Sequence, residues 1–253
     1  MQMFSLTGQT ALITGSSRGL GQSLAIGLAQ AGAKVIIHGS SEQSAADGVK
    51  ALADRGIDAI PLAFDIRKEE QAQGAAAHLS AKGICPTILV NNAGINLRGS
   101  LTKIDAADWT KVIQTNLDGA FHVTRAFVPP MLEAGRGKII NICSLTSTLS
   151  RTGIAPYATA KGGMQMLTRS MAVEWAGLGL NCNGIAPGFF ATDMNLALVN
   201  DNKFDTWLCE RTPARRWGKP EELIGGVIYL AAPASDFVNG HVLAIDGGFL
   251  AAM

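Results

Sequence analysis

Residues 10–21 read TALITGSSRGLG, from Thr10 to Gly21, and this stretch decides the fold class of the chain. Its apolar run Ala11 to Ile13 is typical of a buried strand, and the apolar periodicity of residues 24–29 indicates a helix. Glycines between the two let the backbone turn sharply and approach a ligand closely. The free N–H groups at the start of such a helix favour a bound phosphate. The stretch therefore predicts a strand, a glycine turn and a helix that bind a nucleotide pyrophosphate.

The glycine spacing is Gly-x-x-x-Gly-x-Gly, from Gly15 through Gly19 to Gly21. It differs from the longer-known Gly-x-Gly-x-x-Gly fingerprint of dinucleotide-binding folds. A glycine cluster by itself also marks an ordinary turn. The flanking strand and helix favour the nucleotide-binding interpretation.

Apolar runs of strand length recur along the chain and alternate with helical patterns. We expect strands near residue 11 and at 35–37, 59–60, 88–90, 139–140, 180–185 and 242–245. Such alternation predicts parallel strands joined by right-handed crossovers. With 253 residues and 47% hydrophobic content, one core suffices. We therefore expect a single α/β domain over residues 1–253, a doubly wound parallel sheet of the Rossmann type with helices on both faces.

Two of the expected strands end in polar side chains, at the edge where a doubly wound sheet binds its ligand. The first runs into Asn91, Asn92, Ala93 and Gly94. The second delivers Ser144, which could hydrogen-bond a substrate oxygen but is also ordinary as a turn cap. These segments place candidate ligand-binding groups near the predicted glycine turn.

Tyr157 and Lys161 stand four positions apart in a helical pattern and so share one helix face. A positive charge about 6 Å away stabilises a phenolate by roughly 2.8 kcal/mol at an effective dielectric near 20. That is on the order of 2 pKa units. We therefore predict that Lys161 lowers the pKa of Tyr157, which then exchanges a proton with a substrate oxygen. An isolated Tyr-x-x-x-Lys is also common on helix surfaces, and the neighbouring segments favour the catalytic interpretation.

Together these segments resemble the short-chain dehydrogenase/reductase family over essentially the whole chain. The resemblance implies an NAD(P)-dependent enzyme acting on CH–OH groups, with a tetrad that matches Asn116, Ser144, Tyr157 and Lys161. It implies that Tyr157 is the general acid/base and that Ser144 orients and polarises the carbonyl. Lys161 is implied to hold the nicotinamide ribose and lower the tyrosine pKa, and Asn116 to anchor a water for proton relay.

The same resemblance, together with the glycine turn, implies an extended cofactor site. In it, Asp65 lies beside the adenine and residues 187–192 grip the nicotinamide end. The expected cofactor contacts are Gly15, Ser17, Arg18, Gly19, Leu20, Gly21, Ser40, Ser41, Asp65, Ile66, Asn91, Ala93, Gly94, Tyr157, Lys161, Pro187, Gly188, Phe190 and Thr192.

The end of the second expected strand distinguishes the two nicotinamide cofactors. It reads His38-Gly39-Ser40-Ser41 and carries no carboxylate to hydrogen-bond a ribose 2′-hydroxyl. Arg18 could reach a 2′-phosphate, with Ser40, Ser41 and His38 adding hydrogen bonds. NADP(H) is therefore favoured. NAD(H) stays open because the strand end lacks the second arginine that many NADP(H)-using relatives carry.

Residues 140–144, 183–188, 207–218 and 234–241 most resemble the gluconate 5-dehydrogenase (5-keto-gluconate reductase) branch of the family. In that branch a basic pair commonly follows the Asn-Asn-Ala-Gly-Ile run, whereas this chain keeps only the second basic position, Arg98. Arg98 could pair with a sugar-acid carboxylate or lie on a loop rim. A sugar acid, polyol or ketose is expected to contact Arg98, Ser144 and Tyr157.

Three alternatives remain: a general carbonyl or ketone reductase, a 3-oxoacyl-carrier reductase, and a non-catalytic dinucleotide-binding regulator. The intact Tyr157 and Lys161 argue against the regulator. Near-neutral charge argues against a basic docking surface for an acidic carrier.

Composition excludes several partners. A net charge of +1, from 21 basic and 20 acidic side chains, gives no electrostatic case for nucleic acid or an anionic membrane. No run approaches the roughly 20 apolar residues of a membrane helix, and the start lacks a signal-peptide pattern, so we expect a cytoplasmic protein. Scattered histidines and cysteines predict no metal site. The resemblance implies a homotetramer formed through the helices that carry Asn116 and Tyr157.

Overall fold

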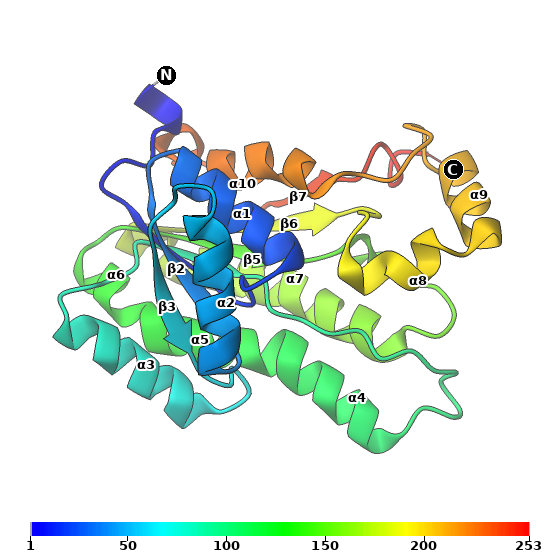
Figure 1. The fold of residues 1–253 in the computed structure, drawn as a ribbon, viewed down its shortest axis with the longest axis horizontal. Coiled ribbons are helices and arrows are strands. Elements are labelled where there is room, and N and C mark those ends of the chain that lie inside the picture. Colours follow the sequence, from blue (N-terminus) through cyan, green and yellow to red (C-terminus); the bar gives the residue numbers. More distant parts are fainter. Residues whose placement is uncertain (1, 253) are drawn as a thin grey trace.

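The computed structural model describes residues 2–252, and Figure 1 shows a twisted sheet with helices on both faces. The sheet contains all seven predicted strands: β1 (Thr10–Ile13), β2 (Lys34–Gly39), β3 (Ala59–Ala63), β4 (Ile88–Asn91), β5 (Gly137–Ile142), β6 (Leu180–Pro187) and β7 (Val242–Ile245). They are all parallel, in the order β3-β2-β1-β4-β5-β6-β7. The predicted doubly wound fold is confirmed. The strand order reverses between β1 and β4, which is where such sheets open a ligand crevice.

The helices connect successive strands. They are α1 (Gly19–Gln30), α2 (Glu42–Ala53), α3 (Glu69–Ala81), α4 (Ala106–Ile113), α5 (Gly119–Phe127), α6 (Pro129–Glu133), α7 (Ala155–Trp175), α8 (Leu196–Val199), α9 (Asn202–Arg211) and α10 (Ile224–Ala231). Shorter turns are the π-helical η2 (Gln114–Asp118) and the 3-10 helices η1 (Gln2–Phe4), η3 (Leu145–Ser147), η4 (Ala176–Leu178), η5 (Asp193–Asn195), η6 (Pro220–Leu223) and η7 (Pro233–Ser235).

Alternate residues of each central strand enter two separate cores, as the period of a strand requires. In β1, Ile13 packs in the core formed with α1, α2 and α10, whereas Leu12 packs in the core formed with α3, α5 and α7. Both side chains are fully buried. The continuous apolar strand is thus explained by burial on both faces, as is usual for a parallel sheet.

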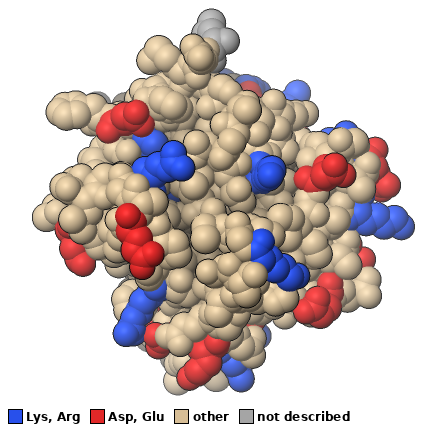
Figure 2. All heavy atoms as spheres, turned by 90° about the vertical axis from the view of Figure 1, so that its left-hand side faces the viewer, with Lys and Arg blue, Asp and Glu red and all other residues tan. Residues whose placement is uncertain are grey.

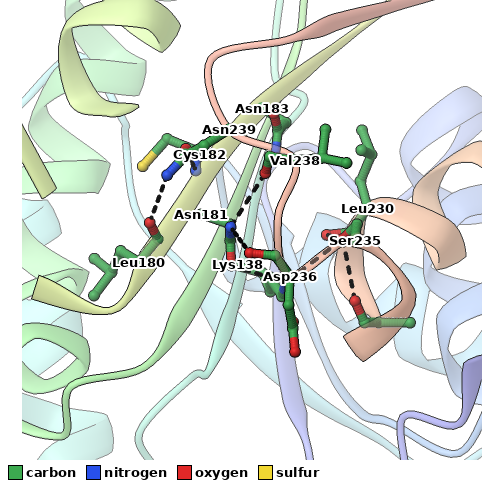
Figure 3. A network of polar contacts seen from close by, with 11 residues as sticks. Lys138, Leu180, Asn181, Cys182, Asn183, Leu230, Ser235, Asp236, Val238 and Asn239 are labelled. Atoms are coloured by element: carbon green, nitrogen blue, oxygen red, sulfur yellow. Dashed lines mark hydrogen bonds and ion pairs between the residues drawn. The ribbon is translucent and has the colours of Figure 1, made fainter. Parts of the chain in front are cut away.

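A polar network around Lys138 joins β5 and β6 to the segment that leads into β7 (Figure 3). The Lys138 ammonium donates to Asn181 Oδ1 at 2.9 Å and pairs with the Asp236 carboxylate at 2.7 Å. The amide of Asn181 in turn donates to the carbonyls of Asp236 and Val238. These contacts attach the chain before β7 to the sheet edge. No helix among residues 2–252 has the length and apolarity needed to span a membrane.

Gly135 precedes β5 and Gly179 precedes β6, and the two differ in how closely other atoms pack against them. Gly179 has φ +87°, and a Cβ there would collide with the carbonyl oxygen of Gly135. Gly135 has φ +63°, but a Cβ on it would meet nothing within 4 Å.

We expect Gly179→Ala to lower the thermal-unfolding midpoint about 5 °C further than Gly135→Ala. Both variants bear the left-handed backbone strain of roughly 1 kcal/mol, but only the first adds an overpacking cost of roughly 1–3 kcal/mol. Scanning calorimetry on both variants checks this. Equal midpoints would mean that the two turns do not pack against each other.

Candidate active site

The glycine turn leaves β1 and enters α1 with a left-handed backbone at two of its glycines. Gly15 has φ +62° and Gly19 has φ +58°. A Cβ at Gly21 would collide with the carbonyl oxygen of Gly15 and the amide of Asn92. A Cβ at Gly19, by contrast, would meet nothing within 4 Å. Gly21 therefore permits close packing of α1 on the strand end, while Gly15 and Gly19 shape the turn.

Side chains at the carboxyl ends of three strands hold this turn in place. Thr14 Oγ1 accepts hydrogen bonds from the backbone N–H groups of Asn92 and Ala93, at 3.0 and 3.1 Å. The Asn92 amide donates to the carbonyl oxygens of Thr14 and Gly15, at 2.9 and 3.1 Å. From β2, His38 Nδ1 accepts the N–H of Gly15 at 2.9 Å. The turn is thus attached to β4 on one side and to β2 on the other.

His38 is a structural histidine, and the prediction that it contributes a hydrogen bond to a 2′-phosphate is wrong. It is 3% exposed, and its Nε2 lies 3.0 Å from the carbonyl oxygen of Phe64. Nδ1 accepts a hydrogen bond, so Nε2 must be the protonated nitrogen that donates to Phe64. Burial lowers the pKa of His38 to about 4. Both ring nitrogens are occupied by the backbone, and the ring is neutral at physiological pH.

The start of α1 provides the features that a dinucleotide phosphate needs. The N-cap residue, Arg18, makes no side-chain cap hydrogen bond, and Arg18 itself is exposed. The first N–H groups of the helix have no intrahelical partner, and the helix dipole places partial positive charge there. The turn residues Ser17, Gly19 and Leu20 surround this uncapped end. The residues present therefore fit a bound pyrophosphate.

Some of the residues predicted to contact the adenine side of the cofactor have side chains that are free to do so, and others do not. Ser41 is the N-cap of α2, its hydroxyl oxygen accepting the N–H of Ser44 at 3.2 Å, and Ser40 precedes it in the exposed turn. The Asp65 carboxylate pairs with Arg67 at 2.6 Å, and the hydrogen bond from that guanidinium lowers the pKa of Asp65. The Ile66 side chain lies in the core, so only its backbone remains for a cofactor.

Asn91 and Asn92 point to opposite sides of the strand end. Asn91 is buried, and its Nδ2 donates to Thr124 Oγ1 and Asn141 Oδ1, both at 2.9 Å. Its predicted cofactor contact is therefore left to its backbone. Asn92, which is not among the expected cofactor contacts, is the residue whose side chain contacts the glycine turn. Successive side chains of a strand point to opposite faces, and this alternation continues one residue beyond β4. It is the sequence signal that could have distinguished the buried Asn91 from Asn92, which contacts the turn.

Tyr157 and Lys161 lie on the same face of α7, as their spacing predicts. Lys161 Nζ is 5.7 Å from the centroid of the Tyr157 ring. Lys161 is 3% exposed, and its ammonium donates to the carbonyl oxygen of Ile142 at the end of β5. Tyr157 is half-buried, so its ring is anchored while part of it remains accessible.

The prediction that Lys161 lowers the pKa of Tyr157 is wrong. Burial raises the pKa of Tyr157, and a hydrogen bond with Ser144 works in the opposite direction. Burial also lowers the pKa of Lys161 to about 8. The expectation considered only the charge of Lys161, whereas burial of the phenol is the largest cause of the shift.

Ser144 and Asn116 complete the predicted tetrad. Ser144 follows β5, and its hydroxyl oxygen accepts hydrogen bonds from the backbone N–H and the hydroxyl of Thr146, at 3.1 and 3.0 Å. Asn116 is fully buried in η2, where Gly119 N–H bonds to the Gln114 carbonyl instead of the usual α-helical partner. Such π-turns often occur at functional sites.

The widened turn of η2 directs the Asn116 side chain at the loop after β4. Its Oδ1 accepts the N–H of Ile95 and its Nδ2 donates to the carbonyl of Ile95, both at 2.8 Å. A Cβ at Gly94 would come within 3.3 Å of Asn116 Oδ1, so glycine leaves room for this clamp. The clamp fixes the loop that carries Arg98, which is exposed.

The predicted nicotinamide segment continues from β6. Gly188 lies against Asp246, where a Cβ would meet the Asp246 backbone at 2.7 Å. Phe190 is buried and pairs with Gly218, and its carbonyl accepts the Asn195 amide at 3.0 Å. Pro187 and Thr192, at the two ends of this segment, are partly buried. The segment therefore has a defined backbone beside the carboxyl ends of the strands.

A family model described as "Enoyl-(Acyl carrier protein) reductase" matches residues 15–250. The chain is 46% identical over 252 residues to 5-keto-D-gluconate 5-reductase of Escherichia coli K12, which covers 99% of both chains. It is 44% identical over 246 residues to gluconate 5-dehydrogenase of Gluconobacter oxydans, which covers 97% of this chain and 96% of that one.

The crystal structure of a gluconate 5-dehydrogenase from Burkholderia cenocepacia, in complex with NADP and tartrate, superposes with a TM-score of 0.97. It is 47% identical and covers 100% of this chain and 99% of that one. The chain belongs to the short-chain dehydrogenase/reductase family. It is therefore an oxidoreductase that acts on CH–OH groups, and the family resemblance expected from the glycine turn and the tetrad positions is confirmed.

The buried neutral His38 predicts a specific loss of stability in acid. Its pKa of about 4 in the folded state lies below the ordinary value of 6.5. Between these two values only the unfolded chain takes up the proton, so stability falls by about 3 kcal/mol as the pH drops from 6.5 to 4. Above 6.5 this residue has no effect on the pH dependence.

We expect His38→Asn to flatten this part of the stability profile, measured by denaturant unfolding at a series of pH values. His78→Asn, at an exposed position on α3, serves as the control and leaves the profile unchanged. An unaltered acid slope in the His38 variant would contradict a buried neutral imidazole.

Proposed function

We propose that this enzyme is an NADP(H)-dependent gluconate 5-dehydrogenase, which interconverts 5-keto-gluconate and gluconate. The observation that carries the proposal is the grouping of Tyr157, Lys161 and Ser144 at the carboxyl edge of the sheet, the edge from which the glycine turn also leaves. The chain is also 46% identical to 5-keto-D-gluconate 5-reductase. The NADP in the Burkholderia relative and the exposed Arg18 support the choice of cofactor.

The chain's own residues divide the chemistry among them. When bound, the cofactor supplies a hydride to the carbonyl carbon or removes one from the alcohol carbon. Tyr157 donates its phenolic proton to the ketone oxygen during reduction and takes it back during oxidation. The Ser144 hydroxyl hydrogen-bonds the same oxygen and stabilises the charge that develops on it.

Lys161 and Asn116 support these two groups. The Lys161 ammonium, positioned by the Ile142 carbonyl, holds the ribose hydroxyls of the nicotinamide nucleoside and keeps positive charge near Tyr157. Asn116 positions the loop after β4 through Ile95, and its turn anchors the water that relays protons. A raised pKa keeps Tyr157 protonated at neutral pH, which favours its role as proton donor in ketone reduction.

The cofactor is held along the carboxyl edge of the sheet. We assign the pyrophosphate to Ser17, Gly19 and Leu20, and the 2′-phosphate to Arg18, Ser40 and Ser41. Asp65 and Ile66 border the adenine, while the backbone from Asn91 to Gly94 and the segment from Pro187 to Thr192 border the nicotinamide half.

The whole chain acts as one catalytic domain, in the cytoplasm, and forms a homotetramer. Exposed Phe121 on α5 and Met166 on α7 support that assembly.

A 3-oxoacyl-carrier reductase is the second candidate, because the tetrad alone does not distinguish it. Docking of an acidic carrier requires a basic surface. On the face shown in Figure 2, basic and acidic side chains are interspersed, which matches the net charge of +1. This pattern favours a small-molecule substrate.

The deciding experiment follows oxidation of NADPH and NADH at the nicotinamide absorbance band. 5-Keto-gluconate, a neutral ketose, an aryl ketone and a 3-oxoacyl thioester are offered separately. We expect turnover of 5-keto-gluconate with NADPH. Turnover of neutral ketones alone would make the enzyme a general carbonyl reductase, and turnover of the thioester alone would make it an acyl reductase.

Tyr157→Phe should reduce turnover by roughly 10²- to 10⁴-fold, because the ring remains while the proton donor is lost. Binding of NADPH, measured by fluorescence titration, should persist. Tyr229→Phe on α10 is the matched control, since these are the chain's two tyrosines, and it should retain full activity. Comparable turnover by the Tyr157 variant would remove this residue from the mechanism.

Arg18→Gln should raise the KM for NADPH about tenfold and leave the KM for NADH unchanged. A charge-assisted hydrogen bond to the 2′-phosphate is lost, and NADH has no such group. Steady-state kinetics with each cofactor measures the two constants. If both rise together, Arg18 serves the turn itself and not the 2′-phosphate.

A further inference from the structure

Arg98 has a neighbour that its sequence position does not reveal. The loop that follows Arg98 is joined to the loop between η3 and α7 by a hydrogen bond from the N–H of Gly99 to the carbonyl of Gly153, at 3.1 Å. Arg151 lies on that second loop, two residues before Gly153. The same loop lies between Ser144 and Tyr157, so both arginines are attached to segments that carry tetrad residues.

A ring from α9 covers the Arg151 side chain. Its guanidinium carbon lies 5.2 Å from the centroid of the Phe204 ring. Phe204 belongs to an aromatic group that includes Phe189, which follows β6, and Trp217. In Figure 1, α9 lies beyond the carboxyl ends of the strands. Arg151 is thus held between the loop before Tyr157 and a helix that overhangs this edge of the sheet.

The two positive charges have no counter-ion among the described side chains. Among the described side chains of residues 2–252, neither Arg98 nor Arg151 forms an ion pair or donates a side-chain hydrogen bond. Burial lowers the pKa of Arg151, and the charge of Arg98 lowers it further, so the two guanidinium groups repel each other. Two unpaired like charges, one of them partly buried, are unfavourable unless an anion binds between them.

We propose that Arg98 and Arg151 together bind the carboxylate of the substrate. This inference rests on the proposed function and names the specificity determinant of the same site. Each guanidinium offers paired N–H donors that match the two oxygens of a carboxylate. Leu97 occupies the place of the first basic residue of the pair, and Arg151 supplies the second cation from a different part of the chain.

The pairing explains how a chain with one basic residue after the Asn-Asn-Ala-Gly-Ile run still selects an acid. A neutral ketose leaves both charges unpaired and gains nothing from them. A sugar acid relieves their repulsion when it binds, and its carboxylate then fixes which carbon lies near Tyr157 and Ser144. Stacking on Phe204 keeps the Arg151 guanidinium oriented before the acid arrives.

The test compares two ketones that differ in one group. L-Sorbose has a CH₂OH group where 5-keto-D-gluconate has its carboxylate, so the ratio of their kcat/KM values reports carboxylate recognition alone. We expect Arg98→Gln and Arg151→Gln each to lower this ratio roughly 10- to 100-fold. The loss should appear in KM for the acid, while KM for NADPH stays unchanged.

Three controls separate recognition from structure. Arg55→Gln removes the same charge from an exposed site after α2 and should leave the ratio unchanged. Arg151→Lys should recover part of the lost ratio, because it restores the charge without the paired donors. The double variant should lose less than the product of the single losses, since both arginines act on one group.

Equal losses for both ketones in Arg151→Gln would make this arginine structural and overturn the proposal. Fully multiplicative losses would also overturn it, because the arginines would then act on different groups. If the wild-type enzyme fails to reduce 5-keto-gluconate, the proposed function fails, and the pair is tested separately with D-gluconate as a competitive inhibitor of neutral ketone reduction. Inhibition that weakens at least tenfold in Arg151→Gln supports the pair, and absence of inhibition of the wild-type enzyme refutes it.

Discussion

The hydrogen bond between the Gly15 N–H and the buried ring of His38 is the constraint on which the site depends. The glycines that bring this turn close to a phosphate have no side chains to hold its shape. Its N–H and carbonyl groups must therefore be satisfied from outside, because unpaired buried polar groups are costly. His38 satisfies the N–H from β2, and Asn92 satisfies two carbonyls from beyond β4. The turn is rigid because its partners belong to the sheet.

The catalytic groups are also held by hydrogen bonds between the sheet and the elements packed against it. Asn91 and Asn141, on neighbouring strands, share a hydrogen bond and reach Thr124 on α5 and Thr168 on α7. This buried network joins the sheet to the helix that carries Tyr157 and Lys161. Buried networks of this kind fix relative positions, since a shift of one member leaves another unpaired. The position of α7 relative to β5 then sets where Ser144 lies relative to Tyr157.

Features that depend on local patterns were predicted correctly, whereas several roles that depend on long-range contacts were not. Glycine positions, strand runs and the Tyr157–Lys161 spacing are local patterns, and each appears where the sequence places it. His38 and Asn91 were selected from strand ends, and Ile66 from the family resemblance. Residues at such positions alternate between inward and outward side chains, and these three side chains are buried. The pKa of Tyr157 was expected to fall because only the nearby charge was considered. Burial, which depends on the packing of several elements, raises it instead.

The sequence by itself determined the order of elements and the parallel sheet, because hydrophobic period and glycine spacing act over a few residues. The tetrad positions came from the resemblance of those segments to a known family. Only the tertiary structure decided which polar side chains face the site and what state they hold there. Asn92 on the glycine turn, Ile95 clamped by Asn116, and Arg151 beside Arg98 are pairings between segments far apart in the chain. Side-chain desolvation and long-range pairing arise when the sheet brings those segments together, and no local pattern encodes them.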